Sequence, residues 1–158
     1  MNILHVLSGD FVTGAETSTV SLIQRQTSAG HRVFVAAGRF DHPVDAKVVS
    51  IPIYDRGWVR RGLNILALRR VIKKEEIDLV HAHSRAASWV SYWASRSTRT
   101  PYLSTLHGRQ HLHFSNKWFN IYGETVLVMC ENIREQMLGQ TDAFRQEQLI
   151  VYRNGLNL

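Results

Sequence analysis

Residues 2–30 decide the fold and read NILHVLSGDFVTGAETSTVSLIQRQTSAG. A short apolar strand at residues 3–7 leads into a small polar loop at residues 8–14, and a helix then runs to Gly30. Such a unit aims the unpaired N–H groups and the positive dipole end of its helix at one spot beyond the strand. The sequence therefore predicts an anion site there, where Gly14 lets backbone N–H groups approach a ligand and Glu16 occupies the first helical turn.

The same alternation of strand and helix continues along the chain. Apolar runs predict seven strands, at residues 3–7, 31–36, 47–53, 77–81, 101–106, 125–129 and 149–152. Helices are predicted at residues 15–30, 62–75, 85–95 and 131–138. Because several strands are continuous apolar runs, we expect an α/β fold with a doubly wound, mostly parallel sheet of about seven strands and helices on both faces.

Four details of these elements are predicted as well. The helix at residues 62–75 is expected to lie on the sheet through one apolar face, made of Leu63, Leu66, Ala67 and Val71. Because Pro52 cannot donate a backbone hydrogen bond, the strand at residues 47–53 is expected to lie at an edge of the sheet or to end near Pro52. Gly139 is expected to end the helix at residues 131–138. The loop at residues 54–58 carries aromatic and arginine side chains that suit the rim of a ligand site.

Length and composition indicate one globular domain. The chain has 158 residues, of which 44% are hydrophobic and 20% charged, an ordinary composition for a domain of this size. It has no apolar run near the roughly 20 residues that span a bilayer, and its first strand is too short for a signal peptide. The single cysteine, Cys130, cannot form an internal disulfide. We therefore expect a cytoplasmic location.

Positive charge is unevenly distributed. The formal net charge is +6, and one segment holds Arg56, Arg60, Arg61, Arg69, Arg70, Lys73 and Lys74. Such a segment favours phosphates, an anionic membrane face or nucleic acid, and an ordinary solvated basic face is an equal alternative. Because the chain has no zinc-finger or RNP-type signature, no nucleic-acid partner is expected.

Several common chemistries lack their motifs. Gly9 and Gly14 have the spacing of a phosphate-binding P-loop, but Ala15 and Glu16 replace its lysine and hydroxyl residue. The dinucleotide fingerprint G-x-G-x-x-G is missing too. There is no G-x-S-x-G elbow, and nothing in the sequence pairs a base with Cys130. An NTPase, a nicotinamide enzyme and a nucleophilic hydrolase are therefore disfavoured.

Histidines gather at two predicted strand ends. His81 and His83 are two residues apart, so they can share a face, and His107, His111 and His113 lie near the end of the next strand. The H-x-H spacing also suits a zinc site, but no acidic or cysteine ligand follows at a recognisable interval, so no metal is expected. We expect hydrogen bonds to satisfy His81 within its strand, while His83, just past the strand, is the better candidate for contacting a ligand.

Five blocks in register carry a family resemblance. They are ILHVLS at residues 3–8, TGAE at 13–16, IDLVHAH at 77–83, PYLSTLHG at 101–108 and VYRNG at 151–155. Together they resemble the N-terminal half of a GT-B glycosyltransferase of family 4, also called group 1. The sequence departs from the family in having Thr13 before Gly14, where two glycines are common, and Cys130 where a serine is favoured.

The resemblance implies one half of a two-domain enzyme. Residues 1–158 would be the N-terminal, acceptor-side, Rossmann-like domain, and the C-terminal donor-binding domain is absent from this chain. Family members transfer a sugar with retention from a nucleotide-diphosphate sugar, which is a co-substrate, usually without a metal or other cofactor. The chain alone is therefore expected to be inactive.

The resemblance also assigns roles to individual residues. Gly14 and Ala15 map to the loop that approaches donor phosphates or acceptor, and His107 maps to the cleft residue that contacts the transferred sugar and assists the reaction. The other residues predicted to bind substrate are Glu16, His83, Arg85, Gly108 and Arg109, the two arginines through an acceptor phosphate.

The prediction from the sequence is thus the acceptor domain of a retaining glycosyltransferase. Its acceptor is expected to be a glycan or a lipid-linked or lipopolysaccharide-type molecule, handled at the inner face of the membrane. Membrane contact rests on the basic segment and on the aromatic residues Trp118, Phe119 and Tyr122. The alternatives are a free-standing module that binds a phosphorylated small molecule and half of a sugar-nucleotide epimerase with the same fold.

Overall fold

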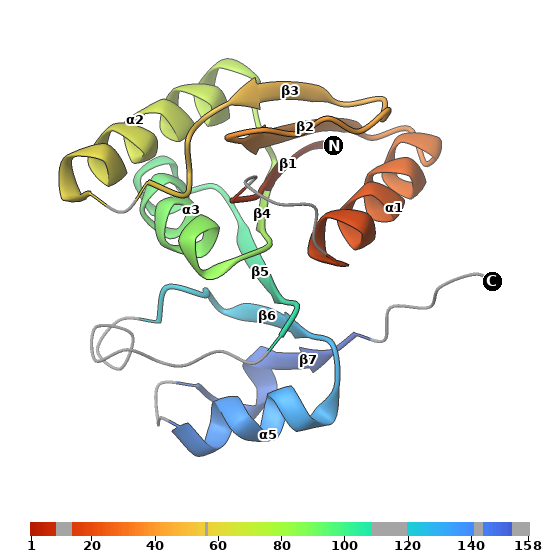
Figure 1. The fold of residues 1–158 in the computed structure, drawn as a ribbon, viewed down its shortest axis with the longest axis vertical. Helices are drawn as coiled ribbons and strands as arrows, with labels where there is room; N and C mark the ends of the chain where they lie inside the picture. The colour runs from red at the N-terminus through yellow and green to blue at the C-terminus, as the bar shows by residue number, and fades with distance from the viewer. Residues whose placement is uncertain (9–13, 56, 109–119, 141–143, 153–158) are drawn as a thin grey trace.

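A single parallel sheet organises the molecule. The computed structural model describes residues 1–8, 14–55, 57–108, 120–140 and 144–152. Within them seven strands pair in the order β3-β2-β1-β4-β5-β6-β7, all parallel (Figure 1). The strands are β1 Asn2–Val6, β2 Arg32–Ala37, β3 Lys47–Ser50, β4 Leu79–Ala82, β5 Tyr102–Leu106, β6 Thr125–Val128 and β7 Leu149–Val151. The predicted fold class is confirmed.

The described helices are α1 Gly14–Ser28, α2 Trp58–Lys74, α3 Arg85–Thr98, α5 Glu131–Gln140 and the short 3₁₀ helix η1 Gln146–Gln148. From β1 the chain passes to β2 beside it and then to β3 at the edge of the sheet. Helix α2 then leads back to β4, which pairs with β1 on its other side. This reversal between β1 and β4 is the switch point at which ligands bind in open α/β sheets, beyond the carboxyl ends of the strands.

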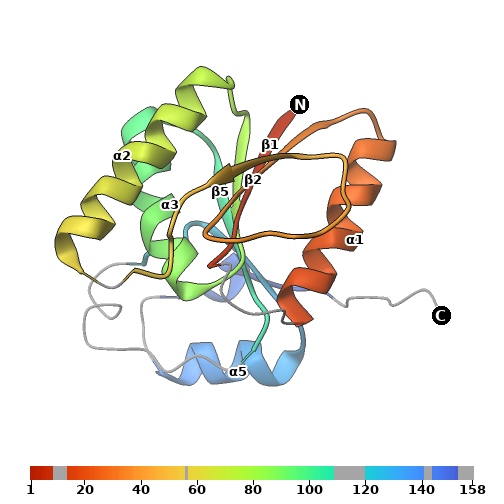
Figure 2. The same ribbon diagram turned by 45° about the horizontal axis from the view of Figure 1, so that its top comes forward.

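The two faces of the sheet are covered by different helices. Leu4 and Val6 of β1 point to one face and pack in a core with Leu68 of α2 and Val90 of α3. Val33 and Val35 of β2 point to the other face and pack with Ile23 of α1. Figure 2 shows α2 and α3 together on one side of the strands and α1 on the opposite side. The sheet is therefore doubly wound, as the sequence predicts.

Most boundaries agree with the sequence. Gly30 ends α1 with a positive φ of 82°, and the His31 N–H donates to the Gln26 carbonyl at 3.0 Å, the pattern of a glycine C-cap. Ser84 caps α3 by accepting a hydrogen bond from the Ala87 N–H at 3.1 Å. Pro52 follows the edge strand β3, as predicted.

Helix α2 departs from the predicted inner face at Leu63 and Leu66, whereas Ala67 and Val71 pack against the core as predicted. Its exposed side holds Leu63 and Leu66, which are 60% and 47% exposed, whereas Asn64, Leu68 and Ile72 are buried. These three have the i, i+4, i+8 spacing of one stripe, and the Asn64 side chain donates to the Pro52 carbonyl at 2.8 Å. The helix has apolar residues on two sides, so the periodicity alone did not decide which side faces the sheet.

Three smaller predictions also need correction. Trp58 is not a loop residue but the first residue of α2, although it is exposed as expected. Helix α5 runs through Gly139 to Gln140 and does not end at the glycine. Tyr122, predicted to contact a membrane, is buried in a core with Phe144, while Trp118 and Phe119 lie outside the described residues.

None of the helices that the structure describes combines the length and apolar character that crossing a bilayer requires.

Among the glycines whose surroundings the structure describes, Gly123 is the one on which packing depends most directly. It has a positive φ of 86°, and a β-carbon built there would lie 2.8 Å from the Tyr102 ring. Gly123→Ala should therefore lower the free energy of unfolding by about 2 to 4 kcal/mol, through the left-handed backbone and overpacking. Chemical unfolding measures this change.

Gly139→Ala is the matched control, because a β-carbon there meets nothing within 4 Å and the residue lies in a helix. It should leave stability unchanged or raise it by up to about 1 kcal/mol. Equal losses from the two substitutions would contradict the role given to Gly123.

Candidate functional site

Four histidines meet on the α1 face of the sheet. In the parallel register His5 of β1 pairs with His81 of β4, so both side chains point to the same face. His83 lies two residues after His81, and His107 lies two residues after Thr105 on β5, which keeps both on that face. Their ring centroids are 4.0 Å apart for His81 and His83, and 5.5 Å for His83 and His107.

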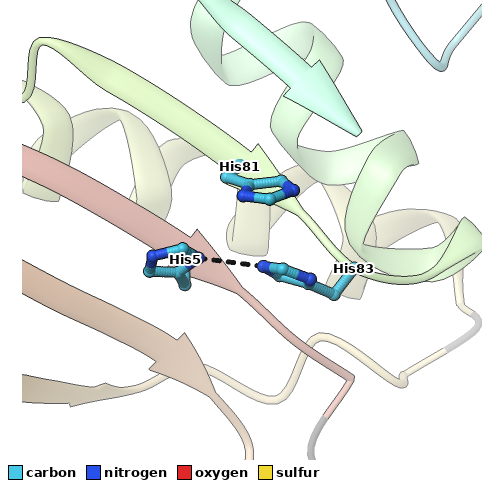
Figure 3. A group of neighbouring side chains, drawn as sticks. All are labelled: His5, His81 and His83. Atoms are coloured by element: carbon cyan, nitrogen blue, oxygen red, sulfur yellow. Dashed lines mark hydrogen bonds between the residues drawn. The ribbon is translucent and has the colours of Figure 1, made fainter. Parts of the chain in front are cut away.

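Hydrogen bonds join these rings into a chain. His5 Nδ1 lies 2.9 Å from His83 Nε2 (Figure 3), and His83 Nδ1 lies 3.2 Å from His107 Nε2. His5 Nε2 lies 2.7 Å from Gln26 Oε1. His83 therefore connects the buried β1 histidine to the histidine at the end of β5.

His81 stands beside this chain and has its own partner. Its Nε2 lies 2.6 Å from Thr105 Oγ1 on the adjacent strand, and both residues are buried. The prediction that hydrogen bonds satisfy His81 within the sheet is confirmed.

Helix α1 covers the histidines with a polar stripe. Glu16, Thr19, Ile23 and Gln26 follow one another at three- and four-residue spacing, so they lie along one side of the helix. Glu16, Thr19 and Ile23 are buried, and Thr19 Oγ1 lies 3.2 Å from His83 Nδ1. This side of α1 faces the sheet with hydrogen-bonding groups around a single isoleucine.

Burial keeps the cluster uncharged. Desolvation lowers the pKa of His5 to about 4, and it holds the pKa values of His81 and His83 well below the usual value for histidine. Repulsion from neighbouring histidines adds to the effect at both residues. Half-buried His107 also has its pKa lowered by desolvation. At neutral pH the four rings act as hydrogen-bonding groups and not as cations.

A metal ion is the other ligand that three histidines suggest. One ring nitrogen from each of His5, His81 and His83 lies within 4.8 Å of the others. However, the His5 and His83 nitrogens that face each other already share a hydrogen bond, which a metal ion bound through those atoms would break. The hydrogen bonds account for the arrangement without an ion, and the absence of a metal stays a prediction.

The other predicted site residues surround the carboxyl ends of β1, β4 and β5. Gly14 and Ala15 open α1, and the buried Glu16 has its carboxylate 3.9 Å from His42 Nε2. Arg85 opens α3 directly after the end of β4, and Gly108 follows His107. Arg109 and the loop at residues 9–13 lie outside the described residues.

Tyr122 is near enough to Arg85 for the two to interact electrostatically. Burial raises the pKa of Tyr122 to about 12, and the Arg85 charge opposes part of that rise. The predicted substrate roles of both arginines stay predictions.

His83 is placed differently from what the sequence suggests. It is buried, and both of its ring nitrogens have protein partners within 3.2 Å. Direct contact with substrate stays a prediction, but this burial favours an indirect role through His107.

Sequence reasoning missed His5, Thr19 and Gln26. One signal was available for His5: it alternates with Leu4 and Val6, which marks it as facing the opposite side of the sheet. For α1 the signal was a run of polar residues at helical spacing. Neither signal reveals that the histidines of the strands meet the polar residues of α1, because that contact depends on the strand register and on the position of the helix.

The buried neutral histidines predict instability in mild acid. Below the unfolded pKa of 6.5 the unfolded chain binds protons that the folded His5, His81 and His83 do not, so stability falls as the pH drops from about 6.5 towards about 4. Each such histidine contributes about 1.4 kcal/mol per pH unit, giving up to roughly 4 kcal/mol per unit for three.

Urea unfolding at a series of pH values measures this slope. His5→Gln removes one titrating ring. It should make the slope shallower by about one third, because three buried histidines contribute to the slope by comparable amounts and one of them is lost. A free energy of unfolding that stays constant between pH 7 and 5 would contradict the buried neutral cluster.

Solved structures with this fold include several glycosyltransferases. A glycosyltransferase from Rickettsia africae ESF-5 matches with a TM-score of 0.87 at 22% sequence identity, over 99% of this chain and 43% of its own. HepE of Anabaena, solved with UDP-glucose, matches with a TM-score of 0.78 at 18% identity, over 99% and 44%. WaaB, a lipopolysaccharide outer core galactosyltransferase, matches with a TM-score of 0.73 at 13% identity, over 96% and 45%.

These likenesses show the fold, and the chain spans less than half the length of each of the three proteins. A comparison with curated proteins found no match. Residues 12–158 match the family described as Glycosyltransferase Family 4. Because that match covers nearly the whole chain, the chain belongs to glycosyltransferase family 4.

Proposed function

We propose that the chain is the acceptor-side, N-terminal half of a retaining glycosyltransferase. The complete enzyme transfers a sugar from a nucleotide-diphosphate sugar to a glycan or lipid-linked acceptor, such as a precursor of lipopolysaccharide or another cell-envelope glycan. Family membership over residues 12–158 supports the transferase class. The single observation that carries the site is His107, held at the carboxyl end of β5 by a buried hydrogen-bonded cluster.

The charges that develop during transfer suit this edge. Breaking the bond between sugar and phosphate builds negative charge on the leaving diphosphate and positive charge on the sugar. The first turn of α1, opened by Gly14 and Ala15, presents backbone N–H groups and a positive dipole end beyond β1. A donor phosphate placed there would be stabilised as it leaves.

His107 has the properties of a positioning group for the sugar. Its lowered pKa, caused by partial burial, keeps the ring neutral at physiological pH, so it contacts a hydroxyl as a hydrogen-bond partner and not as a charge. The reaction then needs no metal and no cofactor from this half. The nucleotide is expected to be held by a second, C-terminal half, which completes the cleft, so this chain alone should not turn over substrate.

Two alternatives make different predictions. A free-standing module would bind a phosphorylated small molecule without any second half, and the gene sequence beyond Leu158 distinguishes this case. Half of a sugar-nucleotide epimerase would need the second half but no acceptor, and epimerised donor would form without one. Membership of a transferase family favours sugar transfer over both.

Replacing His107 tests the site. In the enzyme that contains both halves, His107→Ala should lower kcat by about 100-fold, the lower end of what a positioned proton-handling group contributes. The change is measured as sugar transferred to acceptor with the preferred donor, after a donor screen.

The control is His31→Ala, because His31 precedes β2 at the opposite end of the strands. It should leave turnover unchanged, and circular dichroism should show both variants folded. Full turnover by His107→Ala would remove this residue from the mechanism.

A contact with the inner face of a membrane is the second part of the proposal. The outer face of α2 carries Val59, Leu63 and Leu66 at i, i+4, i+7 spacing, and all three are exposed. Further along the same face stand the exposed residues Arg70, Lys73 and Lys74. Apolar side chains followed by cations fit an anionic lipid surface, which would bring the site to a lipid-linked acceptor. The enzyme would then be a cytoplasmic protein that is peripheral to the membrane.

Not every cation of the basic segment takes part in that surface. Arg60 pairs with Asp55 at 3.1 Å, and the Arg61 guanidinium lies over the Trp89 ring at 5.5 Å. The exposed tryptophan Trp58, at 78% exposure, extends the apolar end of the face. The membrane surface that we propose is therefore made by α2. Buried Tyr122 takes no part in it, and Trp118 and Phe119 lie outside the described residues.

Vesicle binding tests this surface. At low salt the chain should sediment with phosphatidylglycerol vesicles and remain free with phosphatidylcholine vesicles. Lys73→Gln combined with Lys74→Gln should weaken binding roughly 30-fold, at about 1 kcal/mol for each cation. Leu63→Ser should weaken it as well, while Arg25→Gln on α1, on the opposite face of the sheet, should not. Equal binding to both vesicle types would end this part of the proposal.

A further inference from the structure

We propose that Gln26, His5 and His83 form a directed hydrogen-bond relay that holds His107 in the tautomer with its proton on Nε2. The bare Nδ1 of His107 is then the nitrogen that accepts a hydrogen bond from a substrate hydroxyl. The tautomer follows from the distances between side chains in this chain. Only the last step, the contact with a sugar hydroxyl, rests on the proposed function.

The direction is set at Gln26. Its Oε1 lies 2.7 Å from His5 Nε2, and a carbonyl oxygen can only accept a hydrogen bond. His5 Nε2 must therefore carry a proton and donate it. Because burial keeps His5 neutral, its Nδ1 has no proton and can only accept.

The same reasoning passes along the chain to His83. His5 Nδ1 lies 2.9 Å from His83 Nε2, so His83 Nε2 must be the donor. His83 is buried and neutral, which leaves its Nδ1 as an acceptor. Two donors are available to it, the Thr19 hydroxyl at 3.2 Å and His107 Nε2 at 3.2 Å.

His107 is the end of the relay. Its Nε2 must carry a proton to bond with the bare Nδ1 of His83, and a neutral His107 then has its lone pair on Nδ1. An imidazole in water exchanges between its two tautomers, so an orienting partner on one nitrogen decides what the other nitrogen does. His5, His83 and Gln26 are accordingly positioning residues, which act on substrate only through His107.

This arrangement defines what His107 can recognise. Fixed as an acceptor, it selects a group that donates, such as a sugar hydroxyl, and it disfavours a carbonyl or ether oxygen at the same place. If the Gln26 amide were turned to present its NH₂ group, every step would reverse and His107 would carry its proton on Nδ1. The two directions of the relay therefore put the proton of His107 on different ring nitrogens, and this difference can be measured.

Nitrogen-15 NMR of the histidine rings makes this measurement on the 158-residue chain. Protonated and bare ring nitrogens give well-separated shifts, and mildly alkaline buffer keeps all rings neutral. We expect His107, His83 and His5 each to show a protonated Nε2 and a bare Nδ1. A protonated Nδ1 on His107, or equal populations of its tautomers, would overturn the proposal.

Paired substitutions test whether the relay causes the tautomer. Gln26→Glu keeps an oxygen that can only accept, so His107 should retain its pattern, whereas Gln26→Leu removes the acceptor and should shift His107 towards mixed tautomers. His83→Asn places an amide oxygen near the former Nδ1 and should preserve the pattern, whereas His83→Leu should abolish it. An unchanged His107 signal in a folded Gln26→Leu and a folded His83→Leu variant would overturn the relay.

Folding and function are separated in this design. Gln26 is only partly buried on α1, so its variants test the relay even where a His83 substitution prevents folding. The measurement needs neither donor nor acceptor. A failed search for sugar transfer would therefore contradict the proposed function and leave the tautomer result standing, while mixed tautomers in an active enzyme would contradict the relay alone.

Discussion

The constraint on which the rest depends is the parallel register that sets His5 of β1 beside His81 of β4. Side chains that are partners in register point to the same face, so two imidazoles enter the interior at the centre of the sheet. A buried ring that finds no hydrogen-bond partner costs about 1 to 3 kcal/mol. The face above β1 and β4 therefore has to be covered by a helix with polar groups at matching positions.

Helix α1 meets this requirement, and in doing so it differs from the helices on the other face. α2 and α3 pack on the sheet through apolar residues such as Leu68 and Val90, which need the right shape but no particular partner. α1 instead brings Thr19 and Gln26 within hydrogen-bond distance of the histidines. Its position is fixed by directional bonds as well as by the apolar contacts of Ile23, and the same helix opens at the loop that begins the site. Fold and site thus share one set of interactions.

The sequence was sufficient for what depends on local pattern. Seven strands, the end of the first helix at Gly30 and the position of Pro52 at the end of β3 all follow from residues that are neighbours in the chain. It also pointed to His107 through a family resemblance and to the shared face of His81 and His83. The family resemblance was confirmed by the match over residues 12–158, which contains four of the five blocks.

What the sequence could not supply depends on distant residues meeting. His5 looked like one more residue of an apolar strand until the register placed it against His81 and His83. The inner face of α2 was assigned to Leu63 and Leu66 because both sides of that helix carry apolar residues. In the structure Asn64 is buried instead, and its side chain donates a hydrogen bond to the Pro52 carbonyl. In both cases one polar side chain with a remote partner was more informative than the apolar periodicity.

A polar network in a core has consequences that an apolar core lacks. Its members are stable only when all are satisfied, since low polarity strengthens each bond that is made and raises the cost of each one that is lost. Removing His83 would deprive His5, Thr19 and His107 of a partner at once. A substitution at Leu4, by contrast, leaves a cavity whose cost is confined to its neighbours. The effects of substitutions in the histidine cluster should therefore be non-additive, and a change that alters His107 should also affect Gln26, which lies on the side of α1 that faces the sheet.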